Sequence, residues 1–186
     1  PQHKKRSALC EIGVEKIRMI CQWTNTRVYG IISVNQIGIS LWRYIMIRKL
    51  QRADISKVAE IWLETNLKTH YFIPAQYWEN NFDLVKEMLS QAEVYVYENG
   101  QKIQGFIGLN GEYIEGIFVP TEMQSKGVGK LLMDFIKERK EKLFLNVYRK
   151  NARAIHFYHR EGFDIQCEGL DKNTGEKEYT MIWQQK

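Results

Sequence analysis

The chain has 186 residues and a formal net charge of +5, and 44% of its residues are hydrophobic. This is enough for one domain with a sizeable core, and no apolar run approaches the ~20 residues that cross a bilayer, so no membrane association is expected. Residues 1–45 carry seven Lys or Arg and two Glu, which leaves 20 basic and 20 acidic residues for 46–186. The basic pI therefore says nothing about the partners of the larger segment.

The three cysteines, Cys10, Cys21 and Cys167, form no CxxC motif and no Cys and His spacing typical of zinc. A reducing, cytoplasmic location is the simplest expectation, and no metal is expected.

Residues 1–45 show no clear period and lack the apolar core of a secretory signal. We expect them to be an extension outside a functional domain at 46–186, such as upstream sequence read in frame before a natural start at Met46. The alternatives are an extra strand pair packed on the sheet or a basic partner-binding arm.

From residue 45 the chain predicts regular elements. Residues 45–50 predict a strand. Asp54 is expected to cap a first helix, whose apolar positions are Ile55, Val58, Ile61 and Trp62. Pro74 is expected in the first turn of a second helix that continues to Leu89. Residues 94–97 and 103–108 predict a hairpin around Asn99-Gly100, and 112–119 a third antiparallel strand.

The remaining residues continue this alternation. They predict a helix to about Lys140, a strand over 143–148, a helix over 152–160 that ends at Gly162, and strands over 163–167 and 179–183. The order β-α-α-β-β-β-α-β-α-β-β indicates an α/β (α+β) fold, in which a mixed, mostly antiparallel central sheet carries helices on both faces.

The segment Gln124-Ser125-Lys126-Gly127-Val128-Gly129-Lys130 follows the strand that ends Ile117-Phe118-Val119-Pro120 and opens a helix. A turn with two glycines at a helix start leaves backbone N–H groups unpaired and unobstructed by side chains. Such a turn can bind a phosphate group.

Two motifs together resemble the GNAT superfamily of N-acetyltransferases. They are Gln124-x-x-Gly127-x-Gly129 and Asn151-x-x-Ala154-x-x-Phe157-Tyr158-x-x-x-Gly162-Phe163. The resemblance covers residues 46–186 and is greatest to short bacterial members of the YiaC and YjaB type, through the loop Thr69-His70-x-Phe72-Ile73.

The resemblance implies that acetyl-CoA is the co-substrate. The segment 124–130 would bind its pyrophosphate, the strand Ile117-Phe118-Val119 its pantetheine arm, and Asn151 would hold it near the start of the following helix. Asn151 can also act as a helix cap, and the two roles are compatible.

Tyr158 matches the general acid of the family. A phenol has a reference pKa near 10, so it is protonated at pH 7 and can donate to the departing thiolate. Packing beside Phe157 is the alternative role.

The general base is not defined by a motif. Some related protein acetyltransferases carry Glu five residues before the motif Asn, where this chain has Asn146, and an amide cannot act as a base. Glu115 is the candidate substitute, since strand alternation predicts Tyr113, Glu115 and Ile117 on one face. An ordinary solvated carboxylate is the alternative.

Three residues are assigned to the acceptor site by resemblance: Tyr113, His70 and Phe72. The expected reaction is direct attack of a primary amine on acetyl-CoA in a ternary complex, with a protein lysine, an N-terminal amine or a small molecule as acceptor. A non-catalytic acyl-CoA-binding module is an alternative. Nucleic-acid binding is disfavoured because the basic residues are dispersed, and a monomer or a homodimer is equally compatible with the sequence.

Overall fold

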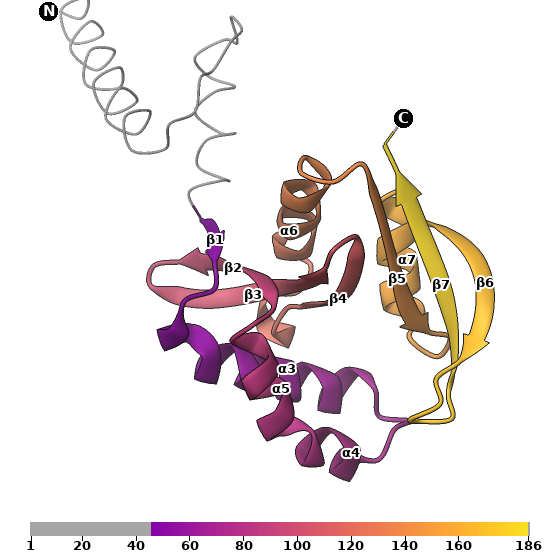
Figure 1. The fold of residues 1–186 in the computed structure, drawn as a ribbon, viewed down its shortest axis with the longest axis horizontal. Coiled ribbons are helices and arrows are strands. Elements are labelled where there is room, and N and C mark those ends of the chain that lie inside the picture. The colour runs from indigo at the N-terminus through magenta and orange to yellow at the C-terminus, as the bar shows by residue number, and fades with distance from the viewer. Residues whose placement is uncertain (1–45, 186) are drawn as a thin grey trace, which may run out of the picture. The chain divides into compact units, whose positions relative to one another are not determined.

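The computed structural model describes residues 46–185, and its centre is a seven-stranded sheet (Figure 1). The strand order is β1 (Ile47–Lys49), β2 (Glu93–Asn99), β3 (Lys102–Asn110), β4 (Tyr113–Phe118), β5 (Lys142–Tyr148), β7 (Lys177–Gln184) and β6 (Asp164–Leu170). Every neighbouring pair is antiparallel except β4 and β5. The predicted mixed, mostly antiparallel sheet is confirmed.

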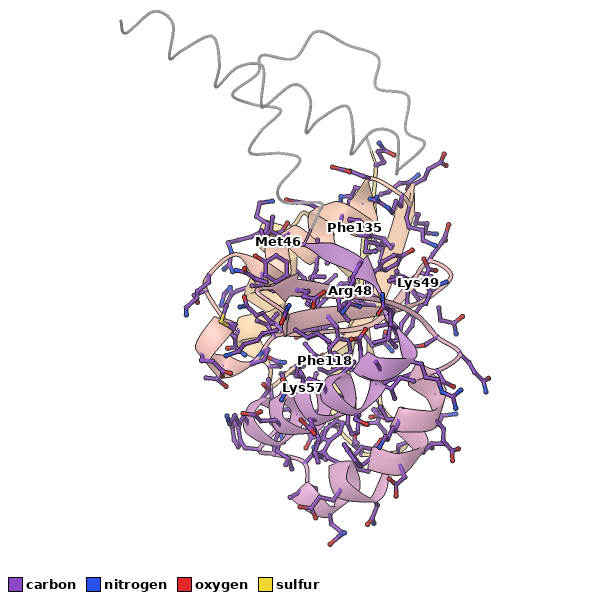
Figure 2. The ribbon with its side chains drawn as sticks, turned by 90° about the vertical axis from the view of Figure 1, so that its left-hand side faces the viewer. Met46, Arg48, Lys49, Lys57, Phe118 and Phe135 are labelled. Carbon is purple, nitrogen blue, oxygen red and sulfur yellow. The ribbon has the colours of Figure 1, made fainter. Side chains whose placement is uncertain are left out.

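Helices cover both faces of this sheet, as predicted. On one face, α3 (Ile55–Thr69) and α5 (Phe82–Leu89) bury Val58, Ile61 and Leu89 against strand residues that include Phe106 and Phe118. On the other, α6 (Val128–Lys137) and α7 (Ala152–Arg160) enclose the larger core. Figure 2 shows Phe118 and Phe135 on opposite sides of the strands.

The predicted second helix is wrong in one respect, because the structure divides it into α4 (Ala75–Asn80) and α5. Asn81 separates them, and its amide donates to the Tyr77 carbonyl at 2.7 Å. A side chain that takes a backbone carbonyl in this way competes with the helical hydrogen bonds. Within the described residues, three α-helices therefore precede β2.

The cap predicted at Asp54 also differs from the structure. Asp54 ends a short 3₁₀ turn, η1 (Arg52–Asp54), and its carboxylate accepts from the Gln51 N–H and pairs with Arg48 of β1 instead of capping α3. Arg48 also binds Glu98 of β2, so these ion pairs tie β1 to β2 and to the start of the helical segment.

The parallel contact between β4 and β5 is confined to one pair, Tyr113 opposite Phe144. The Phe144 N–H donates to the Glu112 carbonyl at 3.1 Å, and from residue 114 onward no residue of β4 pairs with β5. The two strands therefore diverge toward their carboxyl ends, which leaves the β5-facing edge of β4 without a strand partner.

A β-bulge at Glu115 corrects the predicted alternation in β4. Gly116 pairs with Gly108 and Ile114 with Leu109, which leaves Glu115 as the extra residue. Ile114 and Ile117 consequently both pack on the core of α6 and α7. Ile117 does not share a face with Tyr113, because the bulge shifts the alternation by one residue.

The expectation for residues 1–45 lies outside the described residues. Within 46–185, no helix combines the length and apolar character that a membrane span requires.

Candidate active site

The turn between β4 and α6 has the backbone of an anion cradle. Ser125 and Gly127 have φ of 60° and 88°, and Gly127 is the N-cap of α6. The Leu131 N–H makes the first helical bond, to the Gly127 carbonyl, so the N–H groups of Val128, Gly129 and Lys130 precede it. These groups and the helix dipole favour an anion at this point.

The cradle is held in place by neighbouring side chains. Gln124 closes its start by donating to the Val119 carbonyl at 2.9 Å, and Arg153 of α7 donates to the Ser125 hydroxyl at 3.1 Å. Arg153 thus brings a second source of positive charge. The amino group of Lys130 instead pairs with Asp134 at 2.9 Å and Glu161 at 3.5 Å, so Lys130 contributes its backbone to the cradle while Lys126 remains exposed.

Glycine leaves open space in the cradle. A Cβ added to Gly127 would have no neighbour within 4 Å, and one added to Gly129 would meet only ordinary contacts, at 3.5 Å from the Phe157 ring. The protein's own packing therefore does not require glycine at position 129. Gly116 differs, because its added Cβ would lie 2.4 Å from the Phe118 ring, which covers the bulge and stacks on Phe106.

Tyr158 lies on α7, one residue beyond the Phe157 that contacts Gly129. Its side chain is buried in the core with Phe163, and its hydroxyl has no hydrogen-bond partner within residues 46–185. Burial raises the pKa of the Tyr158 phenol well above its usual value, and the nearby Tyr113 adds to the shift. The Tyr158 hydroxyl therefore keeps its proton at pH 7.

A chain of hydrogen bonds links α7 to α3 through His70. The Asn151 amide lies 3.2 Å from His70 Nε2, and His70 Nδ1 lies 2.9 Å from Asn66 Oδ1. Asn66 Nδ2 donates to the Trp62 carbonyl, and Asn151 Oδ1 caps α7 by accepting from the Ala154 N–H. These two backbone contacts fix the orientation of both amides. Asn151 Nδ2 therefore donates to His70 Nε2 and Asn66 Oδ1 accepts from His70 Nδ1, so His70 is neutral with its proton on Nδ1.

The ring of His70 has aromatic neighbours on several sides. It stacks on Trp78 at 5.4 Å between centroids and meets Tyr148 and Phe72 edge-on at 5.1 and 5.7 Å. Burial lowers the pKa of His70 to about 4. Since its Nε2 already accepts a hydrogen bond from Asn151, His70 is not available as a base.

Carboxylates gather around Tyr113, on the opposite side of β4 from α6. Tyr113 packs on Phe144, and its pKa is raised by burial first, then by Glu115 and Glu178. The structure thus adds an acid on β7, Glu178, to the residues around Tyr113, and no sequence motif indicated it. Glu178 lies opposite Tyr148 in the β5 and β7 pairing.

The loop between β6 and β7 is fastened to this region by Asp171. Its carboxylate accepts from the Tyr148 hydroxyl at 2.6 Å and from Thr174 Oγ1 at 2.8 Å. Only the polar composition of residues 171–176 and the Tyr at the end of β5 could have signalled such a contact. Asn66, Arg153 and Thr180 were likewise missed, because their partners are distant in sequence.

The structure thus brings the predicted residues into two connected groups, one around the cradle and α7 and the other around Tyr113 and His70. The cradle, Asn151 and Tyr158 are linked through α7, and Tyr113 is near both Tyr158 and Glu115. His70 and Phe72 join them through Asn151 and Tyr148. Within the described residues, no group of three or more His, Cys, Asp or Glu is placed to hold a metal ion.

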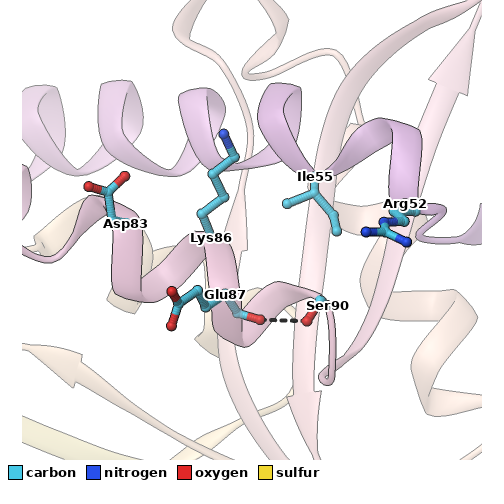
Figure 3. Close-up of a pocket in the computed structure, with 6 residues that line it drawn as sticks. All are labelled: Arg52, Ile55, Asp83, Lys86, Glu87 and Ser90. Carbon is cyan, nitrogen blue, oxygen red and sulfur yellow. Dashed lines mark hydrogen bonds between the residues drawn. The ribbon is translucent and has the colours of Figure 1, made fainter.

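A separate hollow lies between α3 and α5 and shares no residue with these groups (Figure 3). Its lining is mainly charged and polar: Arg52, Ile55, Asp83, Lys86, Glu87 and Ser90. Four of these side chains, Arg52, Asp83, Glu87 and Ser90, are exposed on the helix surface, and we place no chemistry in this hollow.

Comparison with known proteins identifies the family. Residues 90–165 match the acetyltransferase (GNAT) domain. The chain is 35% identical to the peptidyl-lysine N-acetyltransferase YiaC of Escherichia coli over 74% of this chain and 96% of YiaC. It is 29% identical to the E. coli peptidyl-lysine N-acetyltransferase YjaB, over 65% of this chain and 83% of YjaB.

Solved structures agree on the fold. The apo form of E. coli YjaB superposes with a TM-score of 0.68 at 24% identity, over 75% of this chain and 97% of YjaB. YncA of Salmonella typhimurium, solved with acetyl-CoA, gives 0.55 at 20% identity over 75% and 93%. The chain belongs to the GNAT family and is an acetyl-CoA-dependent N-acetyltransferase.

The buried, neutral His70 predicts a pH dependence of stability. An unfolded His with a pKa of 6.5 binds a proton as the pH falls, whereas His70 in the folded state stays neutral until about pH 4. Its contribution is full above pH 6.5 and is lost progressively between pH 6.5 and 4, by up to about 3 kcal/mol. Urea unfolding of wild type and His70→Gln at pH 7.5 and 5 should show a smaller loss in the variant.

His156→Gln is the matched control, because His156 is exposed on the same helix as Asn151. It should keep the wild-type pH dependence. Equal pH dependence in wild type and His70→Gln would contradict the assignment of a neutral, buried His70.

Proposed function

We propose that the domain formed by residues 46–186 transfers the acetyl group of acetyl-CoA to a primary amine, with a lysine side chain of a protein as the acceptor. The observation that carries this proposal is the link between the free N–H groups of α6 and the neutral Tyr158 through Gly129, Phe157 and α7. An anion cradle next to a proton donor suits a thioester such as acetyl-CoA, because the coenzyme part of this molecule contains a pyrophosphate. YiaC and YjaB are peptidyl-lysine N-acetyltransferases, which supports lysine as the acceptor.

On the coenzyme side, the pyrophosphate lies at the N–H groups of Ser125 to Lys130, with Arg153 and Lys126 beside it. The unpaired edge of β4 at Ile117, Phe118 and Val119 offers backbone groups to the pantetheine amides. Asn151 keeps one N–H and one lone pair beyond those used by His70 and Ala154, so it can contact the coenzyme while it caps α7.

On the acceptor side, the charge favours a cation. Tyr113 lies in the field of Glu115, Glu178 and Asp171, and Phe72 and Tyr148 contribute aromatic surface. An ammonium group is attracted both by carboxylates and by aromatic faces. Glu115, the base expected from the sequence, is exposed at the bulge and can receive a proton directly or through water.

The reaction is direct attack in a ternary complex. The neutral amine attacks the thioester carbonyl, the C–S bond breaks, and Tyr158 donates its proton to the departing sulfur. By reference pKa values, full transfer from a phenol to a thiolate is uphill by about 2 kcal/mol. Burial raises the pKa of Tyr158 and adds to this cost, and a buried thiol would have a raised pKa too, which offsets part of it. The phenolate then recovers a proton from the product nitrogen.

A small-molecule amine is the alternative acceptor, since the carboxylates around Tyr113 attract any cationic amine. Thiol release measured with lysine peptides, N-terminal peptides and small amines separates these substrates. Coenzyme binding without thiol release for any of them would instead indicate a non-catalytic acyl-CoA-binding module.

The two cradle glycines should respond differently to alanine. Gly129→Ala places a Cβ in ordinary contact and removes a helical glycine, so the free energy of unfolding should stay equal or rise by up to about 1 kcal/mol. The same Cβ intrudes on the space assigned to the coenzyme, and the KM for acetyl-CoA should rise at least ~10-fold. Gly127→Ala, at φ 88°, should instead lose stability.

Thermal unfolding and acetyl-CoA titration of both variants check this. An unchanged KM for acetyl-CoA in a well-folded Gly129→Ala variant would contradict the assignment of the pyrophosphate to the cradle.

Tyr158→Phe tests the proton donor. We expect kcat to fall by about 100-fold, because a positioned general acid contributes ~10²–10⁴. The Kd for acetyl-CoA should change little. Thiol release and isothermal titration measure the two quantities. Tyr97→Phe is the matched control, because Tyr97 is a buried tyrosine of the same core on β2 and should keep wild-type kcat. Undiminished turnover in Tyr158→Phe would exclude the role.

A further inference from the structure

Glu178 is held in place by Asn146 of the neighbouring strand β5, which is itself oriented by Thr180 of β7. Asn146 Nδ2 of β5 donates to Glu178 Oε1 at 2.9 Å, and Thr180 Oγ1 of β7 donates to Asn146 Oδ1 at 2.9 Å. The threonine fixes the amide so that its nitrogen faces the carboxylate. Glu178 Oε2 carries no hydrogen bond from the residues the structure describes.

No described cation neutralises this carboxylate. Other acids near the same strands are paired, Glu176 with Lys150 at 2.8 Å and Glu168 with Arg149 and Lys177 at 3.1 and 3.0 Å. Glu178 forms no salt bridge within residues 46–185. A half-buried carboxylate that is oriented but unpaired is available to a cation that enters from outside.

The groups around Glu178 come from four elements. Asp171 lies in the β6–β7 loop, Tyr113 on β4 and Tyr148 across the strand pair. Gly169 of β6 lies beside the side chain, since a Cβ built on it would be in ordinary contact with Glu178 at 3.9 Å. Burial raises the pKa of the Glu178 carboxyl, Asp171 raises it further, and the Asn146 amide offsets part of this effect. A carboxylate with a raised pKa is a better proton acceptor near pH 7 than one at its ordinary value.

We propose that Glu178 is the general base that accepts the proton of the acceptor ammonium, and that Asn146 and Thr180 position it. This assignment rests on the proposed amine acetylation. It gives Asn146, which cannot be a base itself, a defined function: its amide presents a carboxylate from the adjacent strand.

Glu115 serves this purpose less well. It is the exposed extra residue of the bulge, and no described side chain donates a hydrogen bond to it. Its charge adds to the field at Tyr113, which attracts the ammonium. Orientation by a fixed donor, which general-base catalysis needs, is found only at Glu178 of these two acids.

The proton balance is as follows. The ammonium gives one proton to the Glu178 carboxylate and becomes a neutral amine, which attacks the thioester carbonyl carbon. The C–S bond breaks and Tyr158 protonates the sulfur. The new amide nitrogen passes its surplus proton to the Tyr158 phenolate, and Glu178 releases its proton to water.

The experiment compares Glu178→Gln with wild type in the full chain, using two acceptor peptides. One carries lysine, and the other carries aminoethylcysteine, whose amine has the same reach but a lower pKa because sulfur withdraws electrons. We expect kcat/KM for the lysine peptide to fall about 100-fold or more, with a smaller loss for the second peptide. The pH–rate profile should shift toward alkaline pH, and the KM for acetyl-CoA and the Tm should stay constant.

Two sets of variants extend the test. Thr180→Val should give an intermediate loss that Thr180→Ser restores, as expected for a positioning residue. Glu168→Gln, which removes an exposed acid of the adjacent strand, is the matched control and should leave every parameter unchanged.

The assignment is overturned if Glu178→Gln keeps kcat/KM within twofold, or if it raises only the KM for the amine while Glu115→Gln abolishes the acid limb of the profile. Those results would leave the proposed acetylation intact. A wild-type chain that releases no thiol with any amine would overturn the acetylation and the base together.

Discussion

The single parallel contact between β4 and β5 is the constraint on which the site depends. If β4 and β5 were antiparallel, their carboxyl ends, and the helices that follow them, would lie at opposite ends of the sheet. Because they are parallel, both carboxyl ends lie at the same end of the sheet. Each of these two strands is followed by a helix, α6 or α7, so two positive helix ends begin there. Pairing limited to Tyr113 and Phe144 then lets the strands diverge. An edge of β4 is left free as a consequence, next to a cradle that α7 braces through Arg153.

The proposed acceptor side is built differently, from side chains of several distant segments. Its acids come from β4, β7 and the β6–β7 loop, and its aromatic rings from the α3–α4 loop and β5. The Asp171 contact with Tyr148 holds the loop against the strand. Because each segment contributes one or two residues, we expect a substitution in any of them to alter acceptor preference more than coenzyme binding.

The glycine turn before α6 and the Asn151 cap of α7, which form the proposed coenzyme side, could be predicted from the sequence because their signals are local. Two glycines, the residues around them and the spacing from Asn151 to Gly162 lie on consecutive positions of single elements. The acceptor side depends on register between strands, which no local pattern contains. Glu178 contacts Asn146 only because β5 and β7 pair in one particular register. The bulge at Glu115 and the break at Asn81 were missed for a related reason, since both arise from hydrogen bonding that competes with a regular pattern.

The hydrogen bonds from Asn151 through His70 to Asn66 and Trp62 all run in one direction. To pass a proton along this chain, two amides would have to become imidic acids, which are high in energy, or flip together with a change of the imidazole tautomer. The chain is therefore an insulator and not a proton wire. It connects the α3–α4 segment mechanically to the start of α7 without providing a path for protons between them.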